Sequence, residues 1–278
     1  MKMKEGFADV DGYKTWYGIA GKEEGVSRLP LLVLHGGPGL PHDYLEPLVS
    51  LADSRRVIFY DQLGCGRSAR PDPGYPWSVR VLVDQVALTR RALGLDGPIL
   101  LYGQSFGGFL ALEHVLTGAA VAGLVLANTA ASMARASEGL RALRATYASP
   151  DGDKEFMKRH FIGGDGVPAE PVGRAFASFG SDSYSAIWGT EAVPNGPLAS
   201  WGVTDRLNEI DIPTLVFNGR DDQLTPECGR ELHEGILGSE FLVFEGSAHL
   251  PFFTEPRKHH RVVGEFPAKA ERQWQKTG

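Results

Sequence analysis

Residues 100–108 of the chain read Leu-Leu-Tyr-Gly-Gln-Ser-Phe-Gly-Gly, an apolar run followed by a serine between two spaced glycines. Gly-x-Ser-x-Gly between a strand and a helix is typical of a turn that exposes a nucleophile. In so tight a turn, side chains at Gly103 and Gly107 would collide with neighbouring backbone. The Ser105 hydroxyl would then project at the carboxyl end of the sheet, beside a helix N-terminus. With 35 glycines in the chain, the alternative is an ordinary glycine-rich turn.

The segments around this turn alternate between two kinds of pattern. Short apolar runs predict buried strands at residues 29–34, 57–60, 99–102, 124–127, 213–218 and 240–244. Helix-period segments predict helices at residues 43–52, 79–93, 106–116 and 226–237, with Ser78 as the N-cap of the second. A hairpin turning at Asp11-Gly12 precedes them. The order predicts an α/β fold whose mostly parallel central sheet is covered by helices on both faces.

The alternation stops between residues 129 and 205, a stretch rich in Ala, Ser, Gly and charged residues. Long loops without secondary structure are rare in compact domains, so this stretch predicts a helical cap inserted into the core. The core would then comprise residues 1–128 and 206–278. The alternative is a linker without regular structure.

Composition narrows the function classes. The chain has 278 residues, 42% of them hydrophobic, and a formal net charge of −6. The acidic balance argues against a nucleic-acid partner or an anionic membrane surface. The start of the chain resembles no signal peptide, no run is long enough to span a membrane, and two cysteines cannot form a disulfide scaffold. These features predict a cytoplasmic protein with free thiols.

A serine nucleophile needs a base, and His249 is the predicted one. A serine hydroxyl attacks poorly unless a neighbouring group removes its proton. In this architecture the partners follow in the order serine, acid, histidine, on loops after late strands. His249 ends a Gly-Ser-Ala-His stretch directly after the strand at residues 240–244. His114 lies within a helix, as a packing or surface residue, and His259 in the charged C-terminal helix is expected to be solvated.

The acid should follow the strand at residues 213–218, where Asp221 and Asp222 are the two candidates. Asp222 is preferred because its place between Gly219 and Pro226 leaves the turn space to direct it back toward the histidine. It would accept the Nδ1 proton of His249 and so present Nε2 to the serine. Asp221 would then be a turn residue or a solvated neighbour.

The oxyanion formed on attack needs N–H donors already in place. One predicted donor is the amide of Phe106, directly after the nucleophile. The other is the amide of Gly37, in the His-Gly-Gly-Pro-Gly stretch at residues 35–39 that follows the first strand of the sheet. His35 is expected to be a structural hydrogen-bonding residue beneath that loop. No His-Glu-x-x-His motif or Cys/His spacing predicts a metal site, and the chemistry needs no cofactor.

Five motifs occur in a characteristic order. They are His-Gly-Gly-Pro-Gly at 35–39, Asp-Gln-Leu-Gly-Cys-Gly-Arg-Ser at 61–68, Gly-Gln-Ser-Phe-Gly-Gly at 103–108, the Gly219 to Pro226 turn, and Gly-Ser-Ala-His at 246–249. Together they resemble the proline iminopeptidase group of α/β-hydrolases, which includes the tricorn-interacting aminopeptidase. The resemblance covers essentially the whole core. It implies a serine exopeptidase that removes an N-terminal residue, often proline, from short peptides or amino-acid amides.

The resemblance also implies acidic residues that bind the substrate ammonium group. Glu191, in a Trp-Gly-Thr-Glu stretch of the cap, resembles one of them. Where the family has the second acid, after the catalytic aspartate, this chain has Gln223. A carboxylesterase or lactone hydrolase that lost ammonium recognition is therefore the alternative within the same chemistry. A ligand-binding protein of this fold without catalysis is the alternative from another class.

Overall fold

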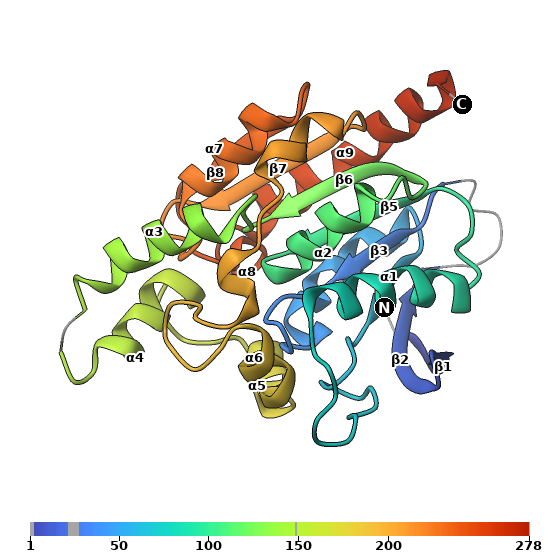
Figure 1. Ribbon diagram of the computed structural model, residues 1–278. Helices are drawn as coiled ribbons and strands as arrows, with labels where there is room; N and C mark the ends of the chain where they lie inside the picture. Colours follow the sequence, from blue (N-terminus) through green and yellow to red (C-terminus); the bar gives the residue numbers. More distant parts are fainter. Residues whose placement is uncertain (1–2, 22–27, 148, 278) are drawn as a thin grey trace.

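One mixed sheet runs through the centre of the molecule (Figure 1). The computed structural model describes residues 3–21, 28–147 and 149–277, and within them the sheet has eight strands. The strands are β1 Lys4–Val10, β2 Tyr13–Ala20, β3 Leu31–Leu34, β4 Val57–Tyr60, β5 Ile99–Gln104, β6 Val121–Ala127, β7 Thr214–Gly219 and β8 Glu240–Phe244. Their spatial order is β1-β2-β4-β3-β5-β6-β7-β8. β1 and β2 are antiparallel to their neighbours and the rest are parallel, which confirms the predicted sheet.

The side chains of the central strands alternate between two cores. In β3, Leu32 and Leu34 pack in one hydrophobic cluster, while Leu31 and Val33 pack in another. Alternation follows from the two-residue repeat of a strand, which sends successive side chains to opposite faces. All four side chains of β3 are buried. Both faces of the sheet are therefore covered, and the strand is apolar throughout rather than on one side.

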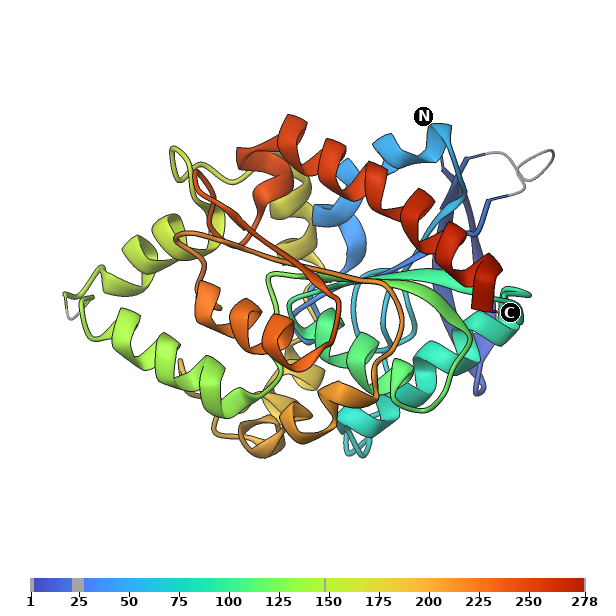
Figure 2. The same ribbon diagram turned by 90° about the horizontal axis from the view of Figure 1, so that it is seen from above.

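Helices supply that cover, as Figure 2 shows for α9 on one side of the sheet and α1 and α2 on the other. The first face is covered by α1 Val79–Ala92, α2 Phe106–Val115 and α7 Pro226–Gly235. The second is covered by the 3₁₀ helix η1 His42–Asp53, α8 Pro251–Thr254 and α9 Pro256–Thr277. No helix in the described ranges is long and apolar enough to cross a bilayer.

Local signals in the sequence have the expected structural effects. Asp11 and Gly12 both adopt positive φ, at 55° and 79°, in the turn between β1 and β2. That conformation suits a tight hairpin, which Asp-Gly favours. The Ser78 hydroxyl accepts a hydrogen bond from the Val81 amide at 3.2 Å and so caps α1. Both predictions are confirmed.

Helical structure fills the segment between β6 and β7, where the sequence predicts a cap. Its elements are α3 Met133–Arg144, α4 Gly152–Phe156, the π-helix η2 Met157–Ile162, α5 Glu170–Ala177, α6 Ser181–Ile187, and the 3₁₀ helices η3 Pro197–Ser200 and η4 Thr204–Glu209. Figure 1 shows α4, α5 and α6 beyond the end of the sheet toward which the central strands point. The domain boundaries at residues 128 and 206 stay a prediction.

One of the buried histidines, His259, corrects a prediction. His259 is only 4% exposed, and its Nε2 lies 3.2 Å from the Tyr102 hydroxyl. The charged composition of α9 predicted a solvated side chain, but position 259 lies on the helix face that packs on the sheet. Burial lowers the pKa of His259 to about 3, and that of His35 and of His114 to about 4.

These depressed pKa values predict how stability depends on pH. In the unfolded chain, His35, His114 and His259 each bind a proton near pH 6.5. In the folded chain they bind it only near pH 3 to 4. The contribution of these three neutral histidines to the free energy of unfolding is therefore fully present above pH 6.5 and is lost as the pH falls toward 4. Near pH 5 the free energy of unfolding should fall by up to about 4 kcal/mol per pH unit. Urea unfolding at pH 7, 6 and 5 measures this slope, and equal stabilities at the three values would contradict the prediction.

Candidate active site

The turn between β5 and α2 holds Ser105 in a strained conformation. β5 ends at Gln104 and α2 begins at Phe106, and the serine between them has φ 56° and ψ −125°. A non-glycine residue at positive φ is uncommon and persists where surrounding structure enforces it. Here the Ser105 amide donates to the Ala127 carbonyl at 2.9 Å, and the Thr129 hydroxyl donates to the Ser105 carbonyl at 2.8 Å. The hydroxyl-bearing residue thus stands at the N-terminus of a helix.

The two motif glycines permit the close packing that holds this turn. A Cβ atom at Gly103 would lie 2.5 Å from the Gly107 carbonyl oxygen. A Cβ atom at Gly107 would overlap the Leu34 carbonyl oxygen. Neither neighbour is the movable end of a side chain, since both are backbone atoms. The predicted collisions at both glycines are confirmed.

His249 and Asp222 lie in direct contact at the ends of two late strands. His249 Nδ1 lies 2.6 Å from Asp222 Oδ1, and both side chains are almost completely buried. Asp221 instead points to solvent and pairs with Arg159. The structure therefore brings together the histidine and the aspartate that sequence reasoning preferred, and it separates Asp221 from them.

Two asparagines hold the Asp222 carboxylate, and sequence reasoning missed both. Asn128 Nδ2 donates to Asp222 Oδ2 at 2.6 Å, and Asn218 Nδ2 approaches the same oxygen at 3.4 Å. Asp222 Oδ1 also accepts from the Leu224 amide at 2.9 Å. Asn128 directly follows β6 and has a φ of 50°, a conformation that asparagine tolerates. A polar residue directly after a buried strand was the signal that could have identified it.

A cavity of about 320 Å³ lies at this end of the sheet, and both Ser105 and His249 line it. Gly37 and Phe106 line it too. Within the described residues, the backbone hydrogen bonds outside the helices and strands include none donated by the Gly37 or Phe106 amide. Most other lining residues are apolar or aromatic: Leu40, Phe109, Met133, Leu140, Met157, Phe161, Phe176, Phe179, Tyr184, Trp188, Ala192 and Leu224, with Gln104, Gln223 and Arg144 as the polar exceptions.

A chain of hydrogen bonds joins the loops around the cavity. The Gly36 amide donates to the Tyr44 hydroxyl at 2.7 Å, and that hydroxyl donates to Gln104 Oε1 at 2.6 Å. Gln104 Nε2 donates in turn to the His249 carbonyl at 3.3 Å. Gln104 therefore connects the glycine loop after β3 with the histidine loop after β8. Only the tertiary structure reveals this role.

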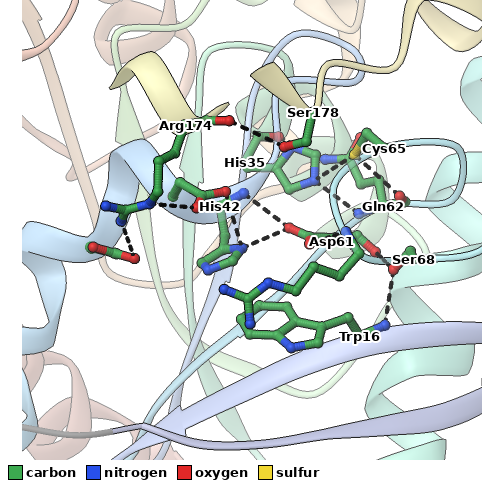
Figure 3. A network of polar contacts seen from close by, with 12 residues as sticks. Trp16, His35, His42, Asp61, Gln62, Cys65, Ser68, Arg174 and Ser178 are labelled. Carbon is green, nitrogen blue, oxygen red and sulfur yellow. Dashed lines mark hydrogen bonds and ion pairs between the residues drawn. The ribbon is translucent and has the colours of Figure 1, made fainter. Parts of the chain in front are cut away.

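His35 supports the glycine loop, as the sequence predicted (Figure 3). The Gln62 amide donates to His35 Nε2 at 2.8 Å, so Nε2 carries a lone pair and the proton lies on Nδ1. Nδ1 then donates to the Gly36 carbonyl at 3.0 Å. Because burial lowers the pKa of His35 to about 4, the ring is neutral at pH 7. The ring joins the loop at residues 35–39 to the loop at residues 61–68.

Asp61 organises the second of these loops (Figure 3). Its Oδ1 accepts from His42 Nδ1 at 2.7 Å, and its Oδ2 accepts from the Arg67 amide at 2.9 Å. The His42 ring stacks on Trp16 with 4.0 Å between ring centroids. In the same loop, the Cys65 thiol donates to the Gln62 carbonyl, and burial raises its pKa. Cys65 is thus an inert packing residue rather than a nucleophile.

Next to this network, His42, Asp43 and Glu46 place three ligand-type atoms close together. A cation already meets the two carboxylates, since Arg174 of α5 lies 3.1 Å from Asp43 Oδ1 and 2.6 Å from Glu46 Oε1. His42 directs its Nδ1 at Asp61 instead. Asp43 and Glu46 therefore form an ion-pair contact between η1 and α5.

Glu191, the predicted ammonium-binding residue, lies in a turn beside the cavity. Its side chain is exposed, and its carboxylate is not part of the cavity lining. Its backbone carbonyl accepts from Trp188 Nε1 at 3.0 Å. Gln223, which replaces the expected second acid, does line the cavity. The ammonium-binding role of Glu191 stays a prediction.

Comparison with known proteins agrees with this fold. The alpha/beta hydrolase family matches residues 31–261. A proline iminopeptidase of Lactobacillus acidophilus is 35% identical and aligns over 91% of this chain and 94% of its own length. One of Clostridium botulinum is 32% identical over 96% of this chain and 98% of its own. The crystal structure of a Mycobacterium smegmatis proline iminopeptidase superposes with a TM-score of 0.89 at 29% identity, covering 97% of this chain and 99% of the other.

The sheet order, the serine turn and the histidine–aspartate contact define a member of the α/β-hydrolase class. The two proline iminopeptidases that are 32% and 35% identical over nearly their whole length then identify the group within this class. The chain belongs to the alpha/beta hydrolase family and, within it, to the proline iminopeptidases.

Proposed function

We propose that this protein is a serine aminopeptidase that releases N-terminal residues from short peptides or amino-acid amides. The observation that carries the proposal is that Ser105, in its strained turn, lines the same cavity as His249, which contacts Asp222. Membership of the proline iminopeptidases supports the amide-cleaving form of this chemistry.

The proposed reaction has two halves that use the same groups. His249 Nε2 takes the proton of Ser105 as the serine attacks the substrate carbonyl, and Asp222 holds Nδ1 and stabilises the charged ring. The amides of Gly37 and Phe106 bind the oxyanion. Protonated His249 gives its proton to the leaving amine, and water then cleaves the acyl-enzyme in the same way. No step requires a cofactor.

The segment at residues 129–205 is proposed to act as a cap that encloses this reaction. Its residues line the cavity from α3, η2, α5 and α6, with Met133, Met157, Phe176 and Tyr184 as examples. An apolar cover limits water around the acyl-enzyme and leaves room for a short substrate only. The cytoplasmic location predicted from the sequence is part of the proposal, and the two free, buried cysteines support it.

The experiment compares free and blocked substrates. Proline and alanine arylamides should be cleaved with kcat/KM at least about a hundredfold above that of their N-acetyl derivatives, since an aminopeptidase site requires the free amine. One observation favours the esterase alternative: no Asp or Glu is among the described residues that line the cavity. Efficient turnover of N-acetylated or neutral esters, with no cleavage of the free arylamides, would replace the aminopeptidase proposal with that alternative.

A further inference from the structure

One side chain among the described residues that line the cavity carries a permanent charge, and its sign is positive. Among the described residues that line it, Arg144 is the only Lys or Arg, and none is Asp or Glu. Most of the remaining lining is aliphatic or aromatic. A guanidinium in an apolar enclosure attracts anions more strongly than it does in water, because the low dielectric weakens screening. The electrostatic character of this cavity therefore favours an anionic group on the substrate.

Arg144 contacts two residues that are not part of the cavity lining. It is the last residue of α3, and its guanidinium carbon lies 4.1 Å from the centroid of the Phe156 ring. Its Nη1 lies 2.6 Å from Asp153 Oδ1, but the Asp153 side chain is 88% exposed. An ion pair with so exposed a partner is weak. The pair therefore does not neutralise Arg144 as a buried carboxylate would, and stacking on Phe156 contributes to the orientation of the guanidinium.

One donor of Arg144 has no acceptor. Its Nε is buried and has no hydrogen-bond partner within the described residues. A buried charged donor without a partner is unfavourable, so a rotation of the side chain that brings this N–H to an acceptor on a ligand would be favourable. Tyr184 also lines the cavity. Burial raises its pKa to about 12, although the Arg144 charge opposes the rise, and its hydroxyl is therefore a neutral donor at pH 7.

We propose that Arg144 binds the C-terminal carboxylate of a short peptide substrate, which makes the preferred substrate a short peptide with a free carboxyl end. The inference rests on the proposed aminopeptidase function. A carboxylate can accept two parallel N–H bonds from one guanidinium. A neutral C-terminal amide fits this geometry less well. A cavity of about 320 Å³ is at the small end of ligand pockets, so the two ends of the substrate must lie close together.

The test uses substrate pairs that differ only in the charge of the C-terminus. The pairs are Pro-Ala and Pro-Ala-amide, and Pro-Ala-Ala and its amide, because a cavity of about 320 Å³ should favour one of these two peptide lengths. For that length, kcat/KM for the free acid should exceed that for the amide by about tenfold. In Arg144→Gln this ratio should fall to about one, because only kcat/KM for the free acid decreases.

Two control variants separate carboxylate binding from a structural role. Arg141 lies on the same helix, is exposed and is not part of the cavity lining, so Arg141→Gln should keep the tenfold ratio. Asp153→Asn removes the ion pair but retains the guanidinium, and it should keep or raise the ratio. Loss of activity on acid and amide alike in Arg144→Gln, with the ratio unchanged, would assign Arg144 a structural role and overturn the inference.

The result also distinguishes failure of the inference from failure of the proposed function. Equal hydrolysis of acid and amide in both pairs by the native enzyme overturns the inference alone. If neither member of either pair is hydrolysed, the aminopeptidase proposal fails, and the inference that depends on it fails with it.

Discussion

Replacing Ser105 with alanine is expected to lower kcat by about 10⁵- to 10⁶-fold on any substrate that the protein turns over. The hydroxyl is the only group at the strained turn that can form an acyl-enzyme, so its loss leaves only binding and the oxyanion donors. Hydrolysis of proline arylamide by the purified variant measures the effect. Covalent labelling by a fluorophosphonate should disappear at the same time, because that reagent reacts with an activated serine.

A matched control is Ser181→Ala, at the start of α6 on the exposed surface, which should retain activity and labelling. Thermal unfolding of the Ser105→Ala protein should stay close to that of the native protein, since alanine removes one oxygen atom. If the variant retained its activity, or if the native protein resisted the fluorophosphonate, the serine mechanism would be wrong. The ligand-binding alternative without catalysis would then gain support.

Asp222→Asn should lower kcat/KM by about 10⁴-fold. The amide of the new side chain would donate to His249 Nδ1, or leave it unbonded, and would no longer stabilise a charged ring. Asn128 would then direct its own N–H toward a group that has lost its negative charge. Stability should therefore fall as well, by about 1 to 3 kcal/mol. Steady-state kinetics and urea unfolding measure the two effects.

Asp221→Asn is the matched control, because the neighbouring residue makes the same chemical change at an exposed position. Asp221 pairs with Arg159 at 3.2 Å, and both side chains are about half exposed. Removing an exposed ion pair costs little, so activity should stay within about twofold. Comparable losses in the two variants would show that Asp222 has no special relation to His249.

Much of the fold could be predicted because its signals are local. The β5 to α2 turn needs glycines where backbone atoms meet, and Gly103 and Gly107 stand at those places. The Asp11-Gly12 turn and the Ser78 cap likewise depend on residues adjacent in sequence. The order of serine, acid and histidine motifs allowed Asp222 and His249 to be paired, since carboxyl ends of parallel strands gather at one edge of the sheet.

Other features could not be predicted because they join segments that are distant along the chain. Gln104 connects Tyr44 with the carbonyl of His249, and no spacing in the sequence announces that contact. His259 was expected in solvent because its helix is rich in charge, but its face of α9 packs on the sheet. Burial of one helix face is decided by the partner surface as much as by the helix itself.

The sequence by itself determined the chemistry of this protein: a serine in a glycine-enforced turn, with its acid and base in the order that one family uses. The reason is that turns and strand ends are governed by residues within a few positions of each other. Only the tertiary structure decided the charge of the cavity, placing Arg144 in its lining and the Glu191 carboxylate outside it. Which helical side chains face the substrate depends on how the segment between β6 and β7 folds over the sheet, and that packing is a property of the whole chain.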